Sequence, residues 1–146
     1  MCRACGFCIG AILAALFASG CGSESSERVD TGSTQVAQNF FTALREQQWD
    51  LAYDLVHIDC KVRVGGAQFR QLAGAYRKQI GFEPESVAVR SCEESGSEAI
   101  AHIAFRGRAG TDQKFFKDAI RLKQQGEKWF VVLSSTFGQP PAKGIL

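Results

Sequence analysis

The chain has 146 residues, which is enough for one domain with short extensions. Hydrophobic residues make up 45% of it and charged residues 22%, which are ordinary values for a globular protein. The formal net charge of +2 is too small to indicate a nucleic-acid-binding protein, and the sequence shows no basic stripe that would hold phosphates or anionic lipid. Composition alone therefore favours no class of partner.

The first 20 residues have the organisation of an export signal. Arg3 supplies a positive charge, residues 9–18 form a short apolar core, and small residues follow directly before Cys21. The apolar core is shorter than the roughly 20 residues that a helix needs to cross a bilayer. We therefore predict that residues 1–20 are a cleaved signal peptide. Its removal takes away one of the 17 basic residues, so that 16 of them face 15 acidic residues.

The segment Phe17-Ala18-Ser19-Gly20-Cys21 resembles the lipobox of bacterial lipoproteins. In that family the cysteine thiol is acylated, and a peptidase cuts the chain before it. Ala18 stands where leucine is usual, whereas Gly20 and Cys21 fit the two most restrictive positions. The resemblance implies a lipid anchor on Cys21 that holds the protein in the cell envelope. Gly22, rather than aspartate, follows the cysteine, which implies the outer membrane, facing the periplasm, rather than the inner membrane.

Residues 21–32 are polar and have no apolar periodicity. Such a segment buries too little apolar surface to order itself, so we predict a flexible tether. A folded domain is expected over residues 33–138 and a short C-terminal tail over residues 139–146.

The cysteines allow two interpretations. Cys2, Cys5 and Cys8 lie in the signal peptide, where metal ligands would be lost on cleavage, so we predict neither a metal nor a cofactor. Cys60 and Cys92 remain in the domain. An oxidising compartment permits a disulfide between them, which would close a loop of about 33 residues and contribute roughly 3–4 kcal/mol. The alternative is two separately buried thiols.

Three helices are predicted in the first half of the domain. Apolar residues recur at helical spacing over residues 34–48, 51–57 and 69–80. Ser33 or Thr34 is expected to cap the first helix, and Asp50 the second. Gly81, followed by Pro84, ends the third helix.

Four strands are predicted in the second half. Period-two alternation covers residues 86–92, 98–106, 114–123 and 128–135, and turn-forming residues connect these segments. Short connections favour an antiparallel meander. Residues 60–64 also have a pattern that would suit a small edge strand. The sequence thus predicts an α+β fold, with three helices packed on one face of a curved four-stranded sheet.

This order of elements, with residues 36–44 and 49–55 in the first two helices and residues 126–132 in the last strand, resembles the nuclear transport factor 2-like superfamily. The resemblance spans residues 33–138 and implies a cone-shaped domain, a fold that also occurs in small secreted lipoproteins of unknown function. Because this fold hosts many activities, the resemblance leaves the function open.

Enzymes of this superfamily hold paired acids, or an aspartate with a tyrosine or histidine, between the helices and the sheet. Asp118 is the first candidate for such a role, since it shares a strand face with Phe116 and Ile120, where an unpaired carboxylate is costly. It would be either a poised base or, as we favour, the ion-pair partner of Arg106 or Arg121. The remaining candidates are Tyr53, Asp54, His57, Asp59, Tyr76 and His102.

His102 and Tyr76 would join Asp118 as catalytic residues if the protein is an enzyme. The alternation does not decide whether His102 faces inward, and a structural histidine in the sheet is the favoured interpretation. Asp54 and His57 are three residues apart on a predicted helix, close enough to interact, although a solvated polar face is the favoured interpretation.

The 11 phenylalanines favour a different activity, because they could line an apolar pocket in the mouth of the cone. We therefore expect a membrane-anchored, non-enzymatic binding or interaction domain for a small apolar ligand or a protein partner, with the sheet face available for a homodimer. The alternative is a small isomerase or dehydratase that uses an acid in the cone. No nucleic acid, metal or cofactor is expected.

Overall fold

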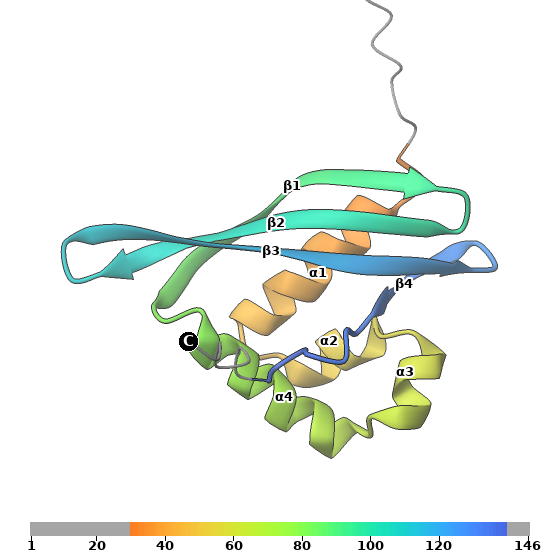
Figure 1. The fold of residues 1–146 in the computed structure, drawn as a ribbon, viewed down its shortest axis with the longest axis horizontal. Coiled ribbons are helices and arrows are strands. Elements are labelled where there is room, and N and C mark those ends of the chain that lie inside the picture. Colours follow the sequence, from red (N-terminus) through yellow and green to blue (C-terminus); the bar gives the residue numbers. More distant parts are fainter. Residues whose placement is uncertain (1–29, 140–146) are drawn as a thin grey trace, which may run out of the picture.

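The computed structural model describes residues 30–139, in which all four helices precede the sheet (Figure 1). The helices are α1 (Ser33–Arg45), α2 (Trp49–Asp54), α3 (Ile58–Arg63) and α4 (Gly66–Gln79). The strands are β1 (Glu83–Ser95), β2 (Glu98–Ala109), β3 (Asp112–Gln125) and β4 (Lys128–Val132). The predicted signal peptide, Cys21 and nearly all of the predicted tail lie outside the described residues. Within residues 30–139, no helix is long and apolar enough to cross a membrane.

The strands form one sheet in the order β1-β2-β3-β4, and each neighbouring pair is antiparallel. The predicted α+β meander is therefore confirmed. β2 and β3 remain paired from Glu98 and Lys123 to Ala109 and Asp112. Their hairpin extends as a two-stranded arm beyond the helices (Figure 1).

The core lies between the helices and one face of the sheet. Alternate residues of β2 are buried, namely Ala99, Ala101, Ile103 and Phe105, and α1 packs Phe40, Phe41 and Leu44 beneath them. The rings of Phe41 and Phe105 meet edge to face with centroids 5.8 Å apart. Burial of such a side chain contributes about 1.5–3 kcal/mol, so these aromatic contacts fix α1 against the sheet.

The predicted edge strand over residues 60–64 is wrong, because most of this segment belongs to α3. Cys60 is only 1% exposed, whereas Val62 is 82% exposed. Two residues that are two apart would share one face of a strand, but a helix turns them to different sides. His57 begins this helix, since its Nδ1 accepts a hydrogen bond from the backbone N–H of Asp59.

The helix caps also differ from the prediction. α1 begins after Gly32, at φ 108°, and Ser33 lies inside the helix. The carboxylate of Asp30 supplies the capping oxygen, since Oδ1 accepts hydrogen bonds from the N–H groups of Gly32 (2.9 Å) and Thr34 (3.4 Å). α2 begins after Gln48, which places Asp50 in its first turn rather than at the cap.

Candidate functional site

The burial pattern of the sheet decides which candidate residues face the helices. Ile103 of β2 is buried, and Asp118 of β3 lies opposite it in the register, so Asp118 belongs to the inner face. It shares that face with Phe116 and Ile120, as the alternation predicted. His102 is exposed and therefore belongs to the outer face, which excludes it from any site inside the cone.

A cavity of about 550 Å³ opens between β3, α4 and the chain that follows β4. Its apolar lining is Phe41, Tyr76, Phe116, Ile120, Val132 and Phe137. Its polar lining includes Gln79, Asp118, Arg121, Ser134, Thr136 and Gln139. The cavity thus combines an aromatic wall with one carboxylate, and we call it the cone cavity.

The structure brings two of the three predicted catalytic residues together. The Tyr76 hydroxyl donates a 2.8 Å hydrogen bond to Asp118 Oδ2, and the backbone N–H of Ala119 donates one of 2.8 Å to Oδ1. Burial, and then the negative charge of Asp118, raise the pKa of Tyr76 far above its ordinary value of about 10. Tyr76 is therefore a neutral phenol that donates to a carboxylate.

The predicted ion pair between Asp118 and Arg106 or Arg121 is not formed. Both arginines are exposed at outer-face positions of their strands. No ion pair within residues 30–139 includes Asp118. The carboxylate instead accepts hydrogen bonds from a phenol and a backbone N–H, which are neutral donors, and no cationic group of the described residues lies within ion-pair distance of it.

Aromatic packing holds Tyr76 in place. Its ring is stacked on Phe137, with centroids 5.0 Å apart and an interplanar angle of 19°, and meets Phe116 edge to face at 6.0 Å. Aromatic pairs of this kind contribute about 0.5–1.5 kcal/mol beyond their buried area. The hydroxyl is therefore aimed at Asp118 by a rigid ring, not by a mobile side chain.

The other polar candidates have structural contacts. His57 is buried and caps α3, while Asp54 is exposed and makes no contact with the His57 ring that the structure records. The Tyr53 hydroxyl donates a 2.9 Å hydrogen bond to the carbonyl of Val64, which ties α2 to the end of α3. None of these side chains lines the cone cavity.

The predicted disulfide is not formed, since Cys60 and Cys92 are both free. Cys92 lies on β1, with Sγ 3.1 Å from the hydroxyl oxygen of Ser33. Cys60 lies in α3, which begins beside β4, because the N–H of His57 donates to the carbonyl of Val131. β1 and β4 are opposite edges of the sheet, about 14 Å apart at ordinary strand spacing. A disulfide needs Cα atoms within about 7 Å.

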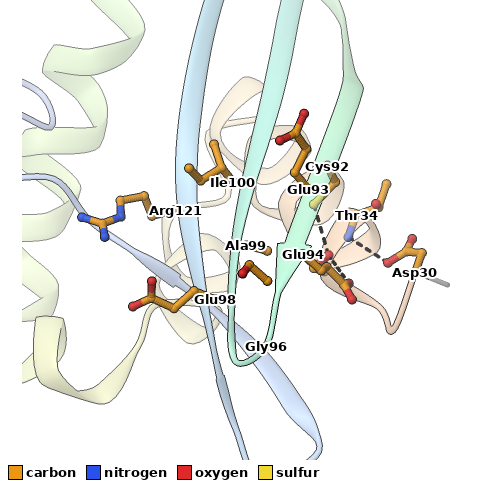
Figure 2. Close-up of a pocket in the computed structure, with 12 residues that line it drawn as sticks. Asp30, Thr34, Cys92, Glu93, Glu94, Gly96, Glu98, Ala99, Ile100 and Arg121 are labelled. Atoms are coloured by element: carbon orange, nitrogen blue, oxygen red, sulfur yellow. Dashed lines mark hydrogen bonds between the residues drawn. The ribbon is translucent and has the colours of Figure 1, made fainter. Parts of the chain in front are cut away.

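A second hollow, an open groove of about 660 Å³, lies at the end of the β1–β2 hairpin (Figure 2). It is acidic, and its carboxylates come from Asp30, Glu93, Glu94 and Glu98. Glu94 accepts hydrogen bonds from the Thr31 N–H (3.1 Å), the Thr31 hydroxyl (3.0 Å) and the Ser33 hydroxyl. The Trp129 indole N–H donates to the Thr31 hydroxyl at 2.8 Å.

These contacts identify the groove as a clamp on the first residues of the domain. Asp30 caps α1, as the dashed bond from Thr34 in Figure 2 shows. The carboxylate of Glu94 is occupied by donors from Thr31 and Ser33. Within the described part of the chain, no group of His, Cys, Asp and Glu is arranged to hold a metal ion. Sequence reasoning missed the clamp because it assigned Asp30 to the tether and Glu94 to a turn.

The architecture is a cone-shaped α+β fold, with helices on one face of a curved meander and a cavity at the mouth. It is similar to an NTF2-like transpeptidase from Campylobacter jejuni, with a TM-score of 0.52 and 13% identity over 68% of this chain and 96% of that one. It is also similar to a SEC-C motif containing protein from Rhodopseudomonas palustris, with a TM-score of 0.52 and 13% identity over 74% of this chain and 81% of that one.

No protein family model matches the chain, and no curated protein matches its sequence. The structural likeness supports the predicted nuclear transport factor 2-like fold. At 13% identity it concerns the fold alone, so the function has to be argued from the residues of the cone cavity.

Proposed function

We propose that the domain binds a small amphipathic molecule in the cone cavity. The observation that carries this proposal is the carboxylate of Asp118, which has no ion-pair partner among the described residues, within an aromatic wall. An apolar ligand body would cover the rings of Phe116 and Phe137. A cationic group would meet both the carboxylate and the faces of the aromatic rings, which attract cations.

Affinity for a positive head group follows from the electrostatics of the cavity. Asp118 already accepts one bond from Tyr76 and one from Ala119, so the remaining lone pairs suit a further donor. Charge-assisted hydrogen bonds are roughly twice as strong as neutral ones. Arg121 also lines the cavity but forms no ion pair with Asp118, so the carboxylate remains open to a cation. We therefore expect the ligand to be an alkyl or aryl ammonium compound.

Three probes with the same apolar tail and different head groups test this proposal: hexylammonium, hexanol and hexanoate. We expect hexylammonium to bind best and hexanoate worst, as measured by chemical-shift titration. Asp118→Asn should remove the preference for the cation while hexanol still binds. Asp112→Asn, at the exposed β2–β3 hairpin, is the control and should change nothing. Equal binding of all three probes by the parent protein would contradict the proposal.

We propose that this binding domain is held at the outer membrane, facing the periplasm, by a lipid on Cys21. The support is the lipobox-like segment that precedes it. From Cys21 to the clamped residue Asp30 is a tether of about nine residues, which spans at most about 30 Å. The domain would then stay close to the membrane, with the cone cavity open to molecules in the periplasm.

An enzyme is the second candidate, favoured by the hydrogen bond between Tyr76 and Asp118. An aspartate base beside a neutral phenol donor could move a proton α to a carbonyl, which is the chemistry of an isomerase or dehydratase. Deuterium exchange at the α-carbon of cyclohexanone in heavy water reports this activity without a known substrate. The enzyme hypothesis expects exchange that both Asp118→Asn and Tyr76→Phe abolish. Exchange no faster than in buffer contradicts it.

A further inference from the structure

Basic side chains gather on the outer face of β2 and β3, which corrects the expectation that the protein has no basic stripe. Period-two alternation places five of them there: Arg106, Arg108, Lys117, Arg121 and Lys123. We call this set the basic face. Along the chain these basic residues alternate with apolar ones and are interspersed with acidic ones, so no basic stripe is visible in the sequence. The pleat of the sheet brings them to one side.

Acidic neighbours compensate only part of this charge. Arg108 lies 3.6 Å from Glu85, and Lys123 lies 3.8 Å from Asp59. Within residues 30–139, no ion pair includes Arg106, Lys117 or Arg121. Glu98, opposite Lys123, and Glu93, opposite Ile100, belong to the end of the face near the tether. The middle of the basic face and the β2–β3 arm therefore carry a positive surplus.

Exposed apolar side chains lie between these charges. Phe115 is 59% exposed and lies opposite Arg106 in the register, and Ile100 is 45% exposed and lies opposite Arg121. Two pairs lie between them, and each joins an alanine to a longer polar side chain: Ala104 lies opposite Lys117, and Ala119 lies opposite His102. An open surface with large apolar side chains and long basic ones suits the boundary between lipid head groups and acyl chains.

We propose that the basic face docks onto an anionic phospholipid surface. The charge complementarity comes from Arg106, Lys117 and Arg121, and Phe115 would enter the head-group layer. A second copy is the weaker occupant, because a symmetric pairing would bring this positive surface close to itself. Nothing in this inference depends on the ligand of the cone cavity.

The proposed anchor adds to this docking without being required for it. A lipid on Cys21 would confine the domain near the membrane, so that a contact that is weak in solution becomes effectively intramolecular. The domain would lie with its sheet on the lipid and its helices and cone cavity turned away.

Vesicle co-sedimentation tests the proposal with the chain from Gly22 onward, which contains the whole described core. We expect this chain to bind phosphatidylcholine vesicles only when they contain phosphatidylglycerol, and binding to weaken as salt rises. Lys117→Gln with Arg121→Gln should lower the partition coefficient by about 10- to 30-fold. Phe115→Ser should lower it as well. Circular dichroism establishes that each variant is folded.

A matched control removes the same charge from another surface, since Arg70 and Lys78 are exposed on α4. Arg70→Gln with Lys78→Gln should retain the binding of the parent chain. An equal loss in both double variants would mean that only net charge matters and would overturn the proposal. Binding to pure phosphatidylcholine would overturn it too. A third result would also overturn it: a dimer, seen by sedimentation analysis, that dissociates in the variant with Lys117→Gln and Arg121→Gln. The basic face would then be an interface between two copies.

Discussion

Tyr76 is a neutral donor because its surroundings oppose ionisation. It is 4% exposed, and its hydroxyl contacts a carboxylate, so its pKa lies above the ordinary value. The unfolded chain can ionise this phenol above about pH 10, whereas the folded protein keeps it protonated. The stability that Tyr76 contributes is therefore complete below pH 10 and is lost as the pH rises further.

We predict that the single tyrosine left in a Tyr53→Phe variant, which is Tyr76, titrates well above pH 10. The increase in ultraviolet absorbance when the phenol becomes a phenolate measures this ionisation. The Tyr76→Phe variant should lose less stability than the parent between neutral pH and strongly alkaline pH. Ionisation of Tyr76 at its ordinary value in the folded protein would contradict the burial and hydrogen bond described here.

The stability contributed by Asp30 depends on pH in the opposite direction, and it does so at acidic pH. Burial alone would raise its pKa, but hydrogen bonds from Gly32 and Thr34 outweigh this effect and lower it. The stability that it contributes is therefore present above about pH 4 and is lost as the pH falls through the lowered pKa.

We predict that Asp30→Ala lowers the free energy of unfolding by about 0.5–2 kcal/mol at neutral pH, because the N-terminus of α1 loses its cap. The difference from the parent should shrink below about pH 4. Urea unfolding at both pH values measures it. Asp112→Ala, at an exposed hairpin, is the control and should cost little at either pH. A cost for Asp30→Ala that does not depend on pH would be inconsistent with a charged cap.

Individual site residues could be predicted only as far as periodicity reaches. Strand alternation predicts that Phe116, Asp118 and Ile120 share one face of the sheet, and in the structure all three lie on the inner face of β3. The partner of Asp118 could not be read from the sequence, because Tyr76 lies 42 residues away on a helix whose orientation depends on the tertiary packing. His102 could not be placed because both faces of β2 contain apolar residues.

At the scale of elements, glycines mark where backbones approach each other. A Cβ at Gly107 of β2 would overlap the carbonyl oxygen of Glu83 and the ring of Phe82. This contact lies where the β1–β2 register shifts, between Pro84 and Ser86. By contrast, a Cβ at Gly74 of α4 would meet no atom within 4 Å.

We therefore predict opposite effects for the same substitution at these two positions. Gly107→Ala should destabilise the protein by about 1–3 kcal/mol, because β1 must move away from β2. Gly74→Ala should stabilise it by about 0.5–1 kcal/mol, because alanine loses less entropy in a helix interior. Thermal unfolding of both variants measures the two effects. Equal behaviour of the two would show that the close approach at Gly107 is absent in solution.

Most elements could be predicted from the sequence, including the short α2 and β4, but α3 could not. The helix that contains Phe40 and Leu44 repeats its apolar spacing over three turns. Its cap was wrong, and it ends at Arg45 rather than at residue 48. α3 has six residues, too few to distinguish a helical from an extended pattern. β2 and β3 continue through their polar ends because the ladder between them persists to Ala109 and Asp112.

At the scale of the whole molecule, the order of helices and strands was sufficient to predict the cone-shaped fold. The charge distribution on the surface of the domain could not be predicted in this way. The basic residues are spread along β2 and β3, and only strand pairing brings Arg106, Lys117 and Arg121 to one surface. The clamp between Glu94 and Thr31 also joins residues 63 positions apart, because α1 packs against β1.

The proposed anchor and the basic face differ greatly in strength. Two or three acyl chains contribute about 0.8 kcal/mol for each buried methylene, whereas each basic residue near an anionic surface contributes about 1 kcal/mol. The lipid on Cys21 should therefore decide whether the protein stays on the membrane. The basic face should decide only how the domain is oriented there.

We predict that Cys21→Ser moves the full-length protein from the membrane fraction to the soluble fraction and abolishes the mass added by acylation. Cys92→Ser is the matched control and should leave the protein in the membrane fraction. Lys117→Gln with Arg121→Gln should also leave it there, because the acyl chains outweigh two charges. Fractionation and mass spectrometry of the same samples measure these outcomes. A Cys21→Ser protein that is cleaved and membrane-bound like the parent would show that the anchor lies elsewhere in the chain.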